Sequence, residues 1–287
     1  MVKFLCLGSG SSGNCYWLGD EKGAILIDAG INFRAVKKIL AENKLAHIPV
    51  RALFITHDHT DHIRAASMIS NSYGCPVYST NEVHRGMEGN YGLQKKIPKA
   101  SQRNMEREEA MQVPCTAFSI TCFPVPHDSH DNVGYRVTWM EEKGECSFCL
   151  VTDCGYVTDD VRKYMKMSDH VVIESNHDVE MLMNGSYPHY LKLRVRGQGG
   201  HLSNDECAGL LREVWHKEMQ HIFLCHLSAD NNTPDLAYKA NARALMEAGA
   251  VVGYQGVTLC ALPRTECSKL YCFGKKEEPV QYVIDFG

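Results

Sequence analysis

Residues 56–62 read Thr-His-Asp-His-Thr-Asp-His and place three imidazoles and two carboxylates within seven positions. Imidazole nitrogen and carboxylate oxygen are ligands for zinc and similar divalent ions, and so dense a cluster would be repelled or desolvated without a cation. An apolar run at 52–55 precedes the segment and a helical pattern starts at Ile63, which predicts a loop between a buried strand and a helix. A solvated polar loop explains the segment poorly, because such loops seldom contain H-x-H-x-D-H. The segment therefore predicts a metal site.

The order of the side chains within this loop predicts two metal ions rather than one. A single turn can aim His57 and His59 at one position, while Asp61 and His62 point to a neighbouring position. One loop cannot complete two coordination shells, so further ligands must come from other strand ends at the same edge. Polar residues directly after apolar runs are the candidates, since mixed sheets tend to place site residues there. These residues are His127 after 118–123, Asp153 after 148–151 and His226 after 221–225.

The rest of the pattern predicts packed sheets with helices outside. The early strands are expected to pair mostly as hairpins, whereas the later ones alternate with helices, which argues against one parallel doubly wound sheet. Strands are expected at 2–7, 16–18, 24–27, 52–55, 76–79, 118–123, 133–139, 148–151, 170–173 and 221–225. Helices are expected at 33–43, 63–72, 159–167, 205–218 and 234–248, the fourth behind Ser203 and Asn204 as caps.

The chain contains no repeat, low-complexity linker or composition break, so residues 1–287 are predicted to form a single domain. Residues 82–111 are polar and rich in Lys, Arg and Glu, and we interpret them as an insertion between core elements that could act as a flexible flap. Residues 264–287 are interpreted as a C-terminal extension of a finished core. Neither segment needs to fold alone.

The composition indicates a globular protein, because 44% hydrophobic residues in 287 can fill a sizeable core. The net charge of −4 argues against a strongly basic nucleic-acid-binding protein, although a local basic patch could still face a polyanion. No apolar stretch approaches the roughly 20 residues that span a bilayer, so no membrane association is expected. Thirteen cysteines, an odd number, and the lack of a signal peptide predict a cytoplasmic protein with mostly buried thiols. Cys146 and Cys149 are interpreted as core residues.

Residues 8–13, Gly-Ser-Gly-Ser-Ser-Gly, match a dinucleotide-binding fingerprint, with Asp28 twenty residues after the first glycine. The fingerprint requires a helix next, whereas residues 14–23 predict a hairpin that offers no helix N-terminus to pyrophosphate. A nicotinamide cofactor is therefore rejected. The loop could still approach a ligand, although a plain tight connection explains it too. The candidate contacts are Ser11, Ser12 and Asn14.

Taken together, these segments resemble the metallo-β-lactamase superfamily, from Val2 to about Leu262. The resemblance is carried by Asp28 in Ile-Leu-Ile-Asp-Ala-Gly, by the H-x-H-x-D-H loop, and by the three strand-end residues in their order along the chain. It implies an α/β (α+β) fold with the αβ/βα four-layer sandwich, in agreement with the expected elements. Ala65 stands where many members have glycine after the ligand loop, a departure that bears on local helix packing.

The same resemblance implies a ligand assignment for two divalent ions, which could be zinc, manganese or iron. One ion would be held by His57, His59 and His127, and the second by Asp61, His62 and His226. Asp153 would bridge the two ions. Asp28 would be structural and would tie down the ligand loop by hydrogen bonds.

A closer resemblance is to the bacterial YycJ/VicX subgroup of the superfamily. It is carried by residues 7–14 (LGSGSSGN), 175–182 (SNHDVEML), 200–204 (GHLSN) and 225–232 (CHLSADNN). Members of that subgroup are associated with DNA exonuclease activity. The resemblance therefore implies DNA as the substrate.

Two divalent ions about 3.5–4 Å apart can share a bridging water, lower its pKa toward about 7 and clamp a phosphoryl oxygen. The predicted function is therefore a metal-dependent phosphodiesterase or DNA exonuclease that uses a metal-bridging hydroxide. His201 is the candidate proton donor for the leaving alkoxide, because it precedes a helix, adjoins glycines and lies outside the metal set. Glu174 could orient that imidazole, much as related RNA-processing members pair an acid with a histidine. Asp61 could help to orient the proton of the water.

Other residues and function classes stay open. His177 is a candidate substrate contact, with the metal shell as its alternative. Two basic segments, 192–196 and the cluster within 95–103, could track phosphates or could simply be solvated faces. A thioester or lactone hydrolase of the same fold, an iron redox protein with one ion, and a regulatory protein are the alternatives to a nuclease.

Overall fold

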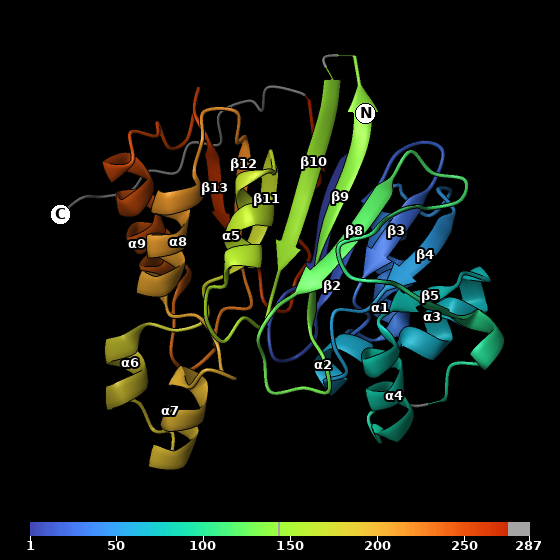
Figure 1. The fold of residues 1–287 in the computed structure, drawn as a ribbon, viewed down its shortest axis with the longest axis horizontal. Helices are drawn as coiled ribbons and strands as arrows, with labels where there is room; N and C mark the ends of the chain where they lie inside the picture. The colour runs from blue at the N-terminus through green and yellow to red at the C-terminus, as the bar shows by residue number, and fades with distance from the viewer. Residues whose placement is uncertain (94, 143, 275–287) are drawn as a thin grey trace.

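Two seven-stranded mixed sheets pack face to face in the computed structural model, which describes residues 1–93, 95–142 and 144–274 (Figure 1). Between the sheets, the ring of Phe4 in one sheet lies 5.2 Å from that of Phe148 and 4.9 Å from that of Phe223 in the other. Helices cover the outer faces, so the molecule has four layers. The predicted αβ/βα sandwich is confirmed.

The first sheet combines an antiparallel half with a parallel half. Its order is β14 (Tyr271–Cys272), β1 (Lys3–Gly8), β2 (Cys15–Gly19), β3 (Ala24–Ile27), β4 (Val50–Phe54), β5 (Val77–Ser79) and β6 (Gln102–Asn104). The strands from β14 to β3 pair antiparallel, and those from β3 to β6 pair parallel. The glycine-rich loop connects β1 to β2, and β2 and β3 form the hairpin predicted after it, so no helix follows the loop.

The second sheet has the same division. Its order is β13 (Thr258–Ala261), β12 (His221–Cys225), β11 (His170–Glu174), β10 (Gly144–Val151), β9 (Val133–Glu141), β8 (Ser119–Pro124) and β7 (Ala110–Gln112). The pairs from β7 to β10 are antiparallel and those from β10 to β13 are parallel. In each sheet the parallel half sends its carboxyl ends to one edge, which is where site residues gather.

The helices pack on the sheets through apolar faces. On the first sheet lie α1 (Phe33–Glu42), α3 (Ala66–Tyr73) and α4 (Asn81–Gly89), and on the second lie α5 (Asp159–Lys166), α8 (Asn204–Val214) and α9 (Pro234–Glu247). At one edge α6 (Val179–Asn184) and α7 (His189–Arg196) form a pair that stands apart from both sheets (Figure 1). None of the described helices combines the length and the hydropathy needed to cross a bilayer.

The expected helix 63–72 is instead two helices, α2 (Thr60–Ile63) and α3. The break falls at Ala65, whose φ of −104° and ψ of 6° leave the helical region. Its N–H donates to the carbonyl oxygen of Ala29, 2.8 Å away, rather than continuing the helix. The expected helix 205–218 ends at Val214 because Trp215 adopts an extended ψ of 139°. Ser203 is its N-cap, with a capping box to Glu206, as predicted for Ser203.

The polar segment 82–111 contains most of α4, a 3-10 turn (Lys99–Ser101), β6 and part of β7. It therefore adds an edge strand to each sheet. Residues 264–274 return to the first sheet through β14, and the rest of the expected C-terminal extension lies outside the described residues. All thirteen cysteines are free and nine are buried, including Cys146 and Cys149, which agrees with their interpretation as core residues.

Candidate metal centre

The carboxyl ends of four strands meet at one edge of the sandwich, beside α2. The strand β4 leads into the loop with His57, and β8, β10 and β12 lead into His127, Asp153 and His226. Asp153 and His226 have positive φ values, 51° and 53°, in a region that few residues other than glycine enter. A backbone conformation of this kind is strained and persists only where contacts with neighbouring residues hold it. The turns are therefore held so that these side chains face the site.

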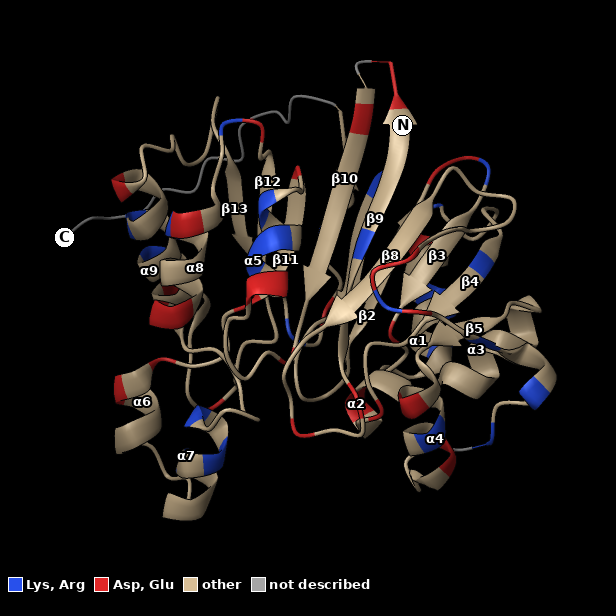
Figure 2. Ribbon diagram, viewed as in Figure 1, with Lys and Arg blue, Asp and Glu red and all other residues tan. Residues whose placement is uncertain are grey.

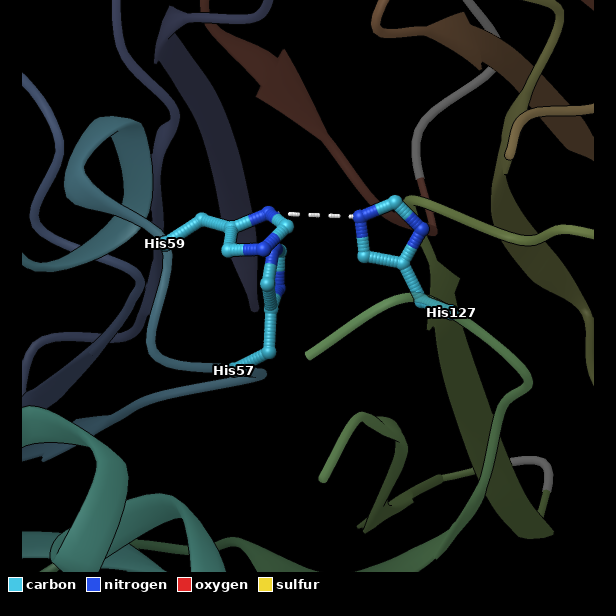
Figure 3. Close-up of side chains that lie close together, drawn as sticks. All are labelled: His57, His59 and His127. Carbon is cyan, nitrogen blue, oxygen red and sulfur yellow. Dashed lines mark hydrogen bonds between the residues drawn. The ribbon is translucent and has the colours of Figure 1, made fainter. Parts of the chain in front are cut away.

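The first group of candidate ligands consists of His57, His59 and His127, whose ligand nitrogens all lie within 4.8 Å of one another. Nδ1 of His59 is 3.3 Å from Nε2 of His127 (Figure 3). The ring centroid of His57 is 4.7 Å from that of His59 and 5.1 Å from that of His127. Three imidazoles therefore converge on one position.

The second group consists of Asp61, His62 and His226, which also satisfy the 4.8 Å limit. Oδ2 of Asp61 lies 3.6 Å from Nε2 of His62 and 3.6 Å from Nε2 of His226. The two histidines are buried, whereas Asp61 is partly exposed. This group could hold an ion next to the first position.

Asp153 lies between the two groups. Its Oδ2 is 3.2 Å from Nε2 of His62, and its Oδ1 is 3.8 Å from Nε2 of His127 and 3.4 Å from Nδ1 of His226. The residue is 2% exposed. One buried carboxylate thus faces ligands of both groups.

Each of the five histidines donates a hydrogen bond from one ring nitrogen and turns the other nitrogen toward its group. The donors and acceptors are His57 Nδ1 to Thr56 Oγ1 (3.0 Å), His59 Nε2 to Asp128 O (3.2 Å), His62 Nδ1 to Asp28 Oδ2 (2.7 Å), His127 Nδ1 to Gly200 O (3.1 Å) and His226 Nδ1 to Glu174 Oε1 (2.9 Å). In a neutral imidazole the nitrogen without hydrogen is the lone-pair donor. Partners of this kind fix the tautomer and orientation of metal-binding histidines.

Two of the inward nitrogens, Nε2 of His57 and Nε2 of His226, are buried and have no hydrogen-bond partner in the described part of the chain. A buried polar atom without a partner is destabilising and rare in native proteins. A divalent ion would satisfy both atoms, and imidazole with carboxylate is a donor set that zinc, manganese and iron accept. The residues therefore fit the metal pair that the sequence predicts.

The loop itself is tied down by Asp28, which is completely buried. Its Oδ1 accepts from the backbone N–H of Thr56 at 2.9 Å, and its Oδ2 accepts from His62 at 2.7 Å. Burial works to raise the pKa of Asp28, and the charge of His62 offsets part of that effect. Asp28 thus holds the loop by hydrogen bonds, which is the structural role that the resemblance implies.

Burial and neighbouring charges together shift the pKa values of the buried groups in the site. Burial tends to raise the pKa of Asp153, but the charges of His226 and His62 outweigh it and hold that pKa well below its usual value. Burial lowers the pKa of His57 well below its usual value, and the neighbouring His62 lowers it further. His57 is therefore neutral, with a lone pair available on Nε2.

A second hydrogen-bonded pair borders the site. Nδ1 of His201 donates to Oε1 of Glu174 at 2.8 Å, and Oε2 of Glu174 accepts from the backbone N–H groups of Cys154 and Leu202 at 2.8 and 3.2 Å. Burial opposes ionisation of Glu174, but the charge of His201 and its hydrogen bond lower that pKa to about 2. Glu174 is thus a fixed buried anion, and it also accepts from His226.

Residues 24–226 match the family model described as a beta-lactamase superfamily domain. The chain belongs to the metallo-β-lactamase superfamily. Exodeoxyribonuclease YycJ of Bacillus anthracis is 32% identical over 252 residues, which are 88% of this chain and 92% of that protein. Exodeoxyribonuclease WalJ of Streptococcus pneumoniae is 34% identical over 251 residues, which are 88% of this chain and 91% of that protein. The predicted superfamily and subgroup are confirmed.

Two solved structures have a fold similar to that of this chain. Zinc-bound PqqB from Methylobacterium extorquens superposes with a TM-score of 0.65 at 16% identity, covering 93% of this chain and 99% of that one. The metallo-β-lactamase fold protein YhfI from Bacillus subtilis gives 0.64 at 14% identity, covering 93% and 98%. At such low identity these similarities show the fold alone.

Of the predicted catalytic and substrate residues of this chain, some adjoin the groups of candidate ligands and others do not. Asn14 is close, because its Nδ2 is 2.9 Å from Nε2 of His62. His201 and Glu174 form a further possible ligand group with Asp153 and His226, although His201 was expected to lie outside the metal set. Ser12 is exposed, and its carbonyl oxygen accepts from Arg64.

His177, the remaining predicted substrate contact, is 1% exposed and belongs to none of the possible ligand groups in the described residues. Its Nδ1 is buried without a hydrogen-bond partner among those residues. Its carbonyl oxygen accepts from the N–H of Asn204, and its backbone bridges to Ser203. His177 is therefore buried against residues 203–204 of the GHLSN segment.

The sequence prediction missed Asp128. Its Oδ1 lies 3.4 Å from Nε2 of His127, its carbonyl oxygen accepts from His59, and its Oδ2 accepts from Arg194 at 2.7 Å. The available signal was its position directly after His127 in a segment rich in His and Asp. This carboxylate connects the first ligand group with α7.

Proposed function

We propose that this chain is a dinuclear metal-dependent hydrolase of phosphodiesters, and that it degrades DNA from an end. The observation that carries the proposal is the set of five histidines, each fixed through one nitrogen with the other aimed at a group of ligands. The choice of DNA is supported by the curated relatives named exodeoxyribonuclease, at 32% and 34% identity over most of the chain.

In this mechanism His57, His59 and His127 would hold one ion, and Asp61, His62 and His226 the other, with Asp153 facing both. Divalent ions there would acidify a bound water and polarise a phosphoryl oxygen of the substrate. The chain's own residues orient the ligand side chains, exclude water from the buried side of the site, and donate or orient protons. Asp61 is the ligand with the most exposed side chain of its group, at 22%, so it can also orient the attacking water.

His201 would donate a proton to the leaving alkoxide. Its Nδ1 is engaged by Glu174, and its side chain remains 20% exposed, so Nε2 is the nitrogen that can reach a substrate oxygen. Because Glu174 is buried and bonded to two backbone N–H groups, it is a positioning residue that fixes the direction of the imidazole.

The function is tested by adding manganese or zinc to metal-free protein and assaying end-labelled duplex DNA and, separately, a glutathione thioester. We expect two ions per chain by elemental analysis and DNA degradation that is lost in His57→Ala and His59→Ala. Thioester hydrolysis without DNA degradation would show the alternative acyl hydrolase. One iron per chain with no hydrolysis would indicate the redox alternative.

Substituting His201 by Gln is expected to lower kcat on DNA by about 10²–10⁴-fold, the usual contribution of general acid catalysis. The loss should be much smaller on bis(p-nitrophenyl) phosphate, because p-nitrophenolate leaves without protonation. Steady-state rates on the two substrates provide the measurement. An equal loss on both would show that His201 does not act as the proton donor.

A further inference from the structure

The helix α7 stands at the rim of the metal centre and buries none of its eight residues. Tyr190 is 72% exposed and Leu193 is 58% exposed. With Arg194 they follow i, i+3, i+4 spacing, so the three side chains form one stripe on the helix surface. We call these three residues the α7 stripe. Contiguous exposed apolar surface that is rimmed by charged residues is a feature of binding sites.

The α7 stripe is connected to the candidate metal ligands through Asp128. Nε of Arg194, at its C-terminal end, donates to Asp128, and the carboxylate of Asp128 lies 3.4 Å from Nε2 of His127. The backbone N–H of Asp128 also donates to the carbonyl oxygen of Gly199, just beyond the helix. A strand whose end lies in the metal centre would therefore pass over the α7 stripe as it leaves.

The charge of this region suits a polyanion. The helix carries Lys192, Arg194 and Arg196 and no acidic residue, and Figure 2 shows only basic colour along it. The acidic residues beside it are Asp128, which follows His127 and accepts from Arg194, and Glu180 on α6. In contrast, Figure 2 shows basic and acidic residues mixed along α4, on the other side of α2.

We propose that the α7 stripe is the binding surface for the single-stranded DNA end whose terminal phosphodiester lies in the metal centre, an inference that rests on the proposed function. Bases of an unpaired strand stack on Tyr190 and Leu193, and its phosphates face the exposed Arg196, while Lys192 adds positive charge from the side of α7 where its Nζ donates to the carbonyl oxygen of Met183. Aromatic side chains beside a basic track bind single strands in this way, whereas a duplex hides its base faces. The helix is about 12 Å long, enough for roughly two to four nucleotides.

The test compares the double variant Tyr190→Ala/Leu193→Ala with the wild type on duplex DNA that ends in a single-stranded tail. We expect the KM of the double variant to rise about five- to hundredfold, since base stacking is lost, with the main effect in KM rather than kcat. Tyr190→Phe keeps the ring and should restore a KM close to that of the wild type. Tyr254→Ala, another exposed tyrosine (64%) in the loop before β13, is the matched control and should leave KM unchanged.

A salt titration gives a second readout. Arg196→Gln should reduce the slope of log KM against log salt by about one relative to the wild type, because one phosphate contact is removed. If the double variant raises KM no more than Tyr254→Ala does, the α7 stripe does not bind the strand. If the wild type hydrolyses neither DNA nor bis(p-nitrophenyl) phosphate with any of the metals, the proposed function itself fails. The two failures are thus distinguishable.

Discussion

Substituting Asp153 by Asn is expected to abolish metal-dependent hydrolysis and to leave fewer than two ions bound per chain. Asp153 is buried, and its two oxygens face ligands of both groups, with Oδ2 3.2 Å from Nε2 of His62 and Oδ1 3.8 Å from Nε2 of His127. An amide of the same shape removes the negative charge and turns an N–H donor toward one of those groups. A buried site that loses its anion no longer offsets the desolvation of a divalent cation.

The loss can be measured without an activity assay. Metal ions that bind the folded chain raise its thermal unfolding temperature, by an amount set by their concentration relative to Kd. The wild type should therefore gain stability when zinc or manganese is added, and Asp153→Asn should gain much less. Elemental analysis after dialysis gives the ion count directly.

The matched control for this change is Asp159→Asn on α5. The side chain of Asp159 is fully exposed beside Arg162, where an ion pair contributes little to stability. This variant should keep two ions and wild-type rates. An Asp153→Asn protein with two ions and normal kcat would show that the carboxylate between the two groups is not a ligand.

The clustering of the candidate ligands could be predicted from the sequence because each candidate follows a strong local signal. A buried strand ends, a polar residue follows, and parallel strands bring such residues to one edge of the sheet. His127, Asp153 and His226 all follow this rule, and the structure brings them together with the His57 loop. The apolar pattern along the sequence and the strand order in the sheet agree here, because both follow from the burial of these strands in the core.

Several of the elements that the sequence did not predict bury little of their surface. The strands β6 and β7 have three residues each and are largely exposed, so they lack an alternating pattern. The helix α7 buries none of its residues, so its sequence carries no apolar stripe facing a core. The contact of Asp128 with both His127 and Arg194 was missed because it depends on where α7 lies. No local sequence pattern predicts that position.

Replacing Gly30 by Ala is expected to destabilise the chain by about 3 kcal/mol or more, at the upper end of the cost of overpacking. A Cβ at this position would lie 1.5 Å from the carbonyl oxygen of Asp61 and 2.7 Å from the backbone nitrogen of Asn14. Both neighbours are backbone atoms, so neither can rotate away.

Three loops are joined at this point by backbone hydrogen bonds. Gly30 donates to Asn14 at 2.8 Å, Asn14 donates to Asp61 at 2.8 Å, and Ala29 donates to His62 at 2.7 Å. An added methyl group must push the ligand loop away from the glycine-rich loop, and Asp61 and His62 would then leave their group. Metal affinity should fall together with stability, because the same backbone contacts fix both.

The matched control is Gly209→Ala in α8, where a Cβ would meet no atom within 4 Å. Alanine in a helix interior is favoured over glycine by about 0.5–1 kcal/mol, so this variant should be slightly more stable than the wild type. Urea unfolding of the metal-free proteins measures both changes, and titration with zinc measures the affinity. A Gly30→Ala protein that unfolds at the same urea concentration as the wild type would show that the loops can separate freely. The glycine-rich loop would then have no part in positioning Asp61, and the close approach at Gly30 would be incidental to the metal centre.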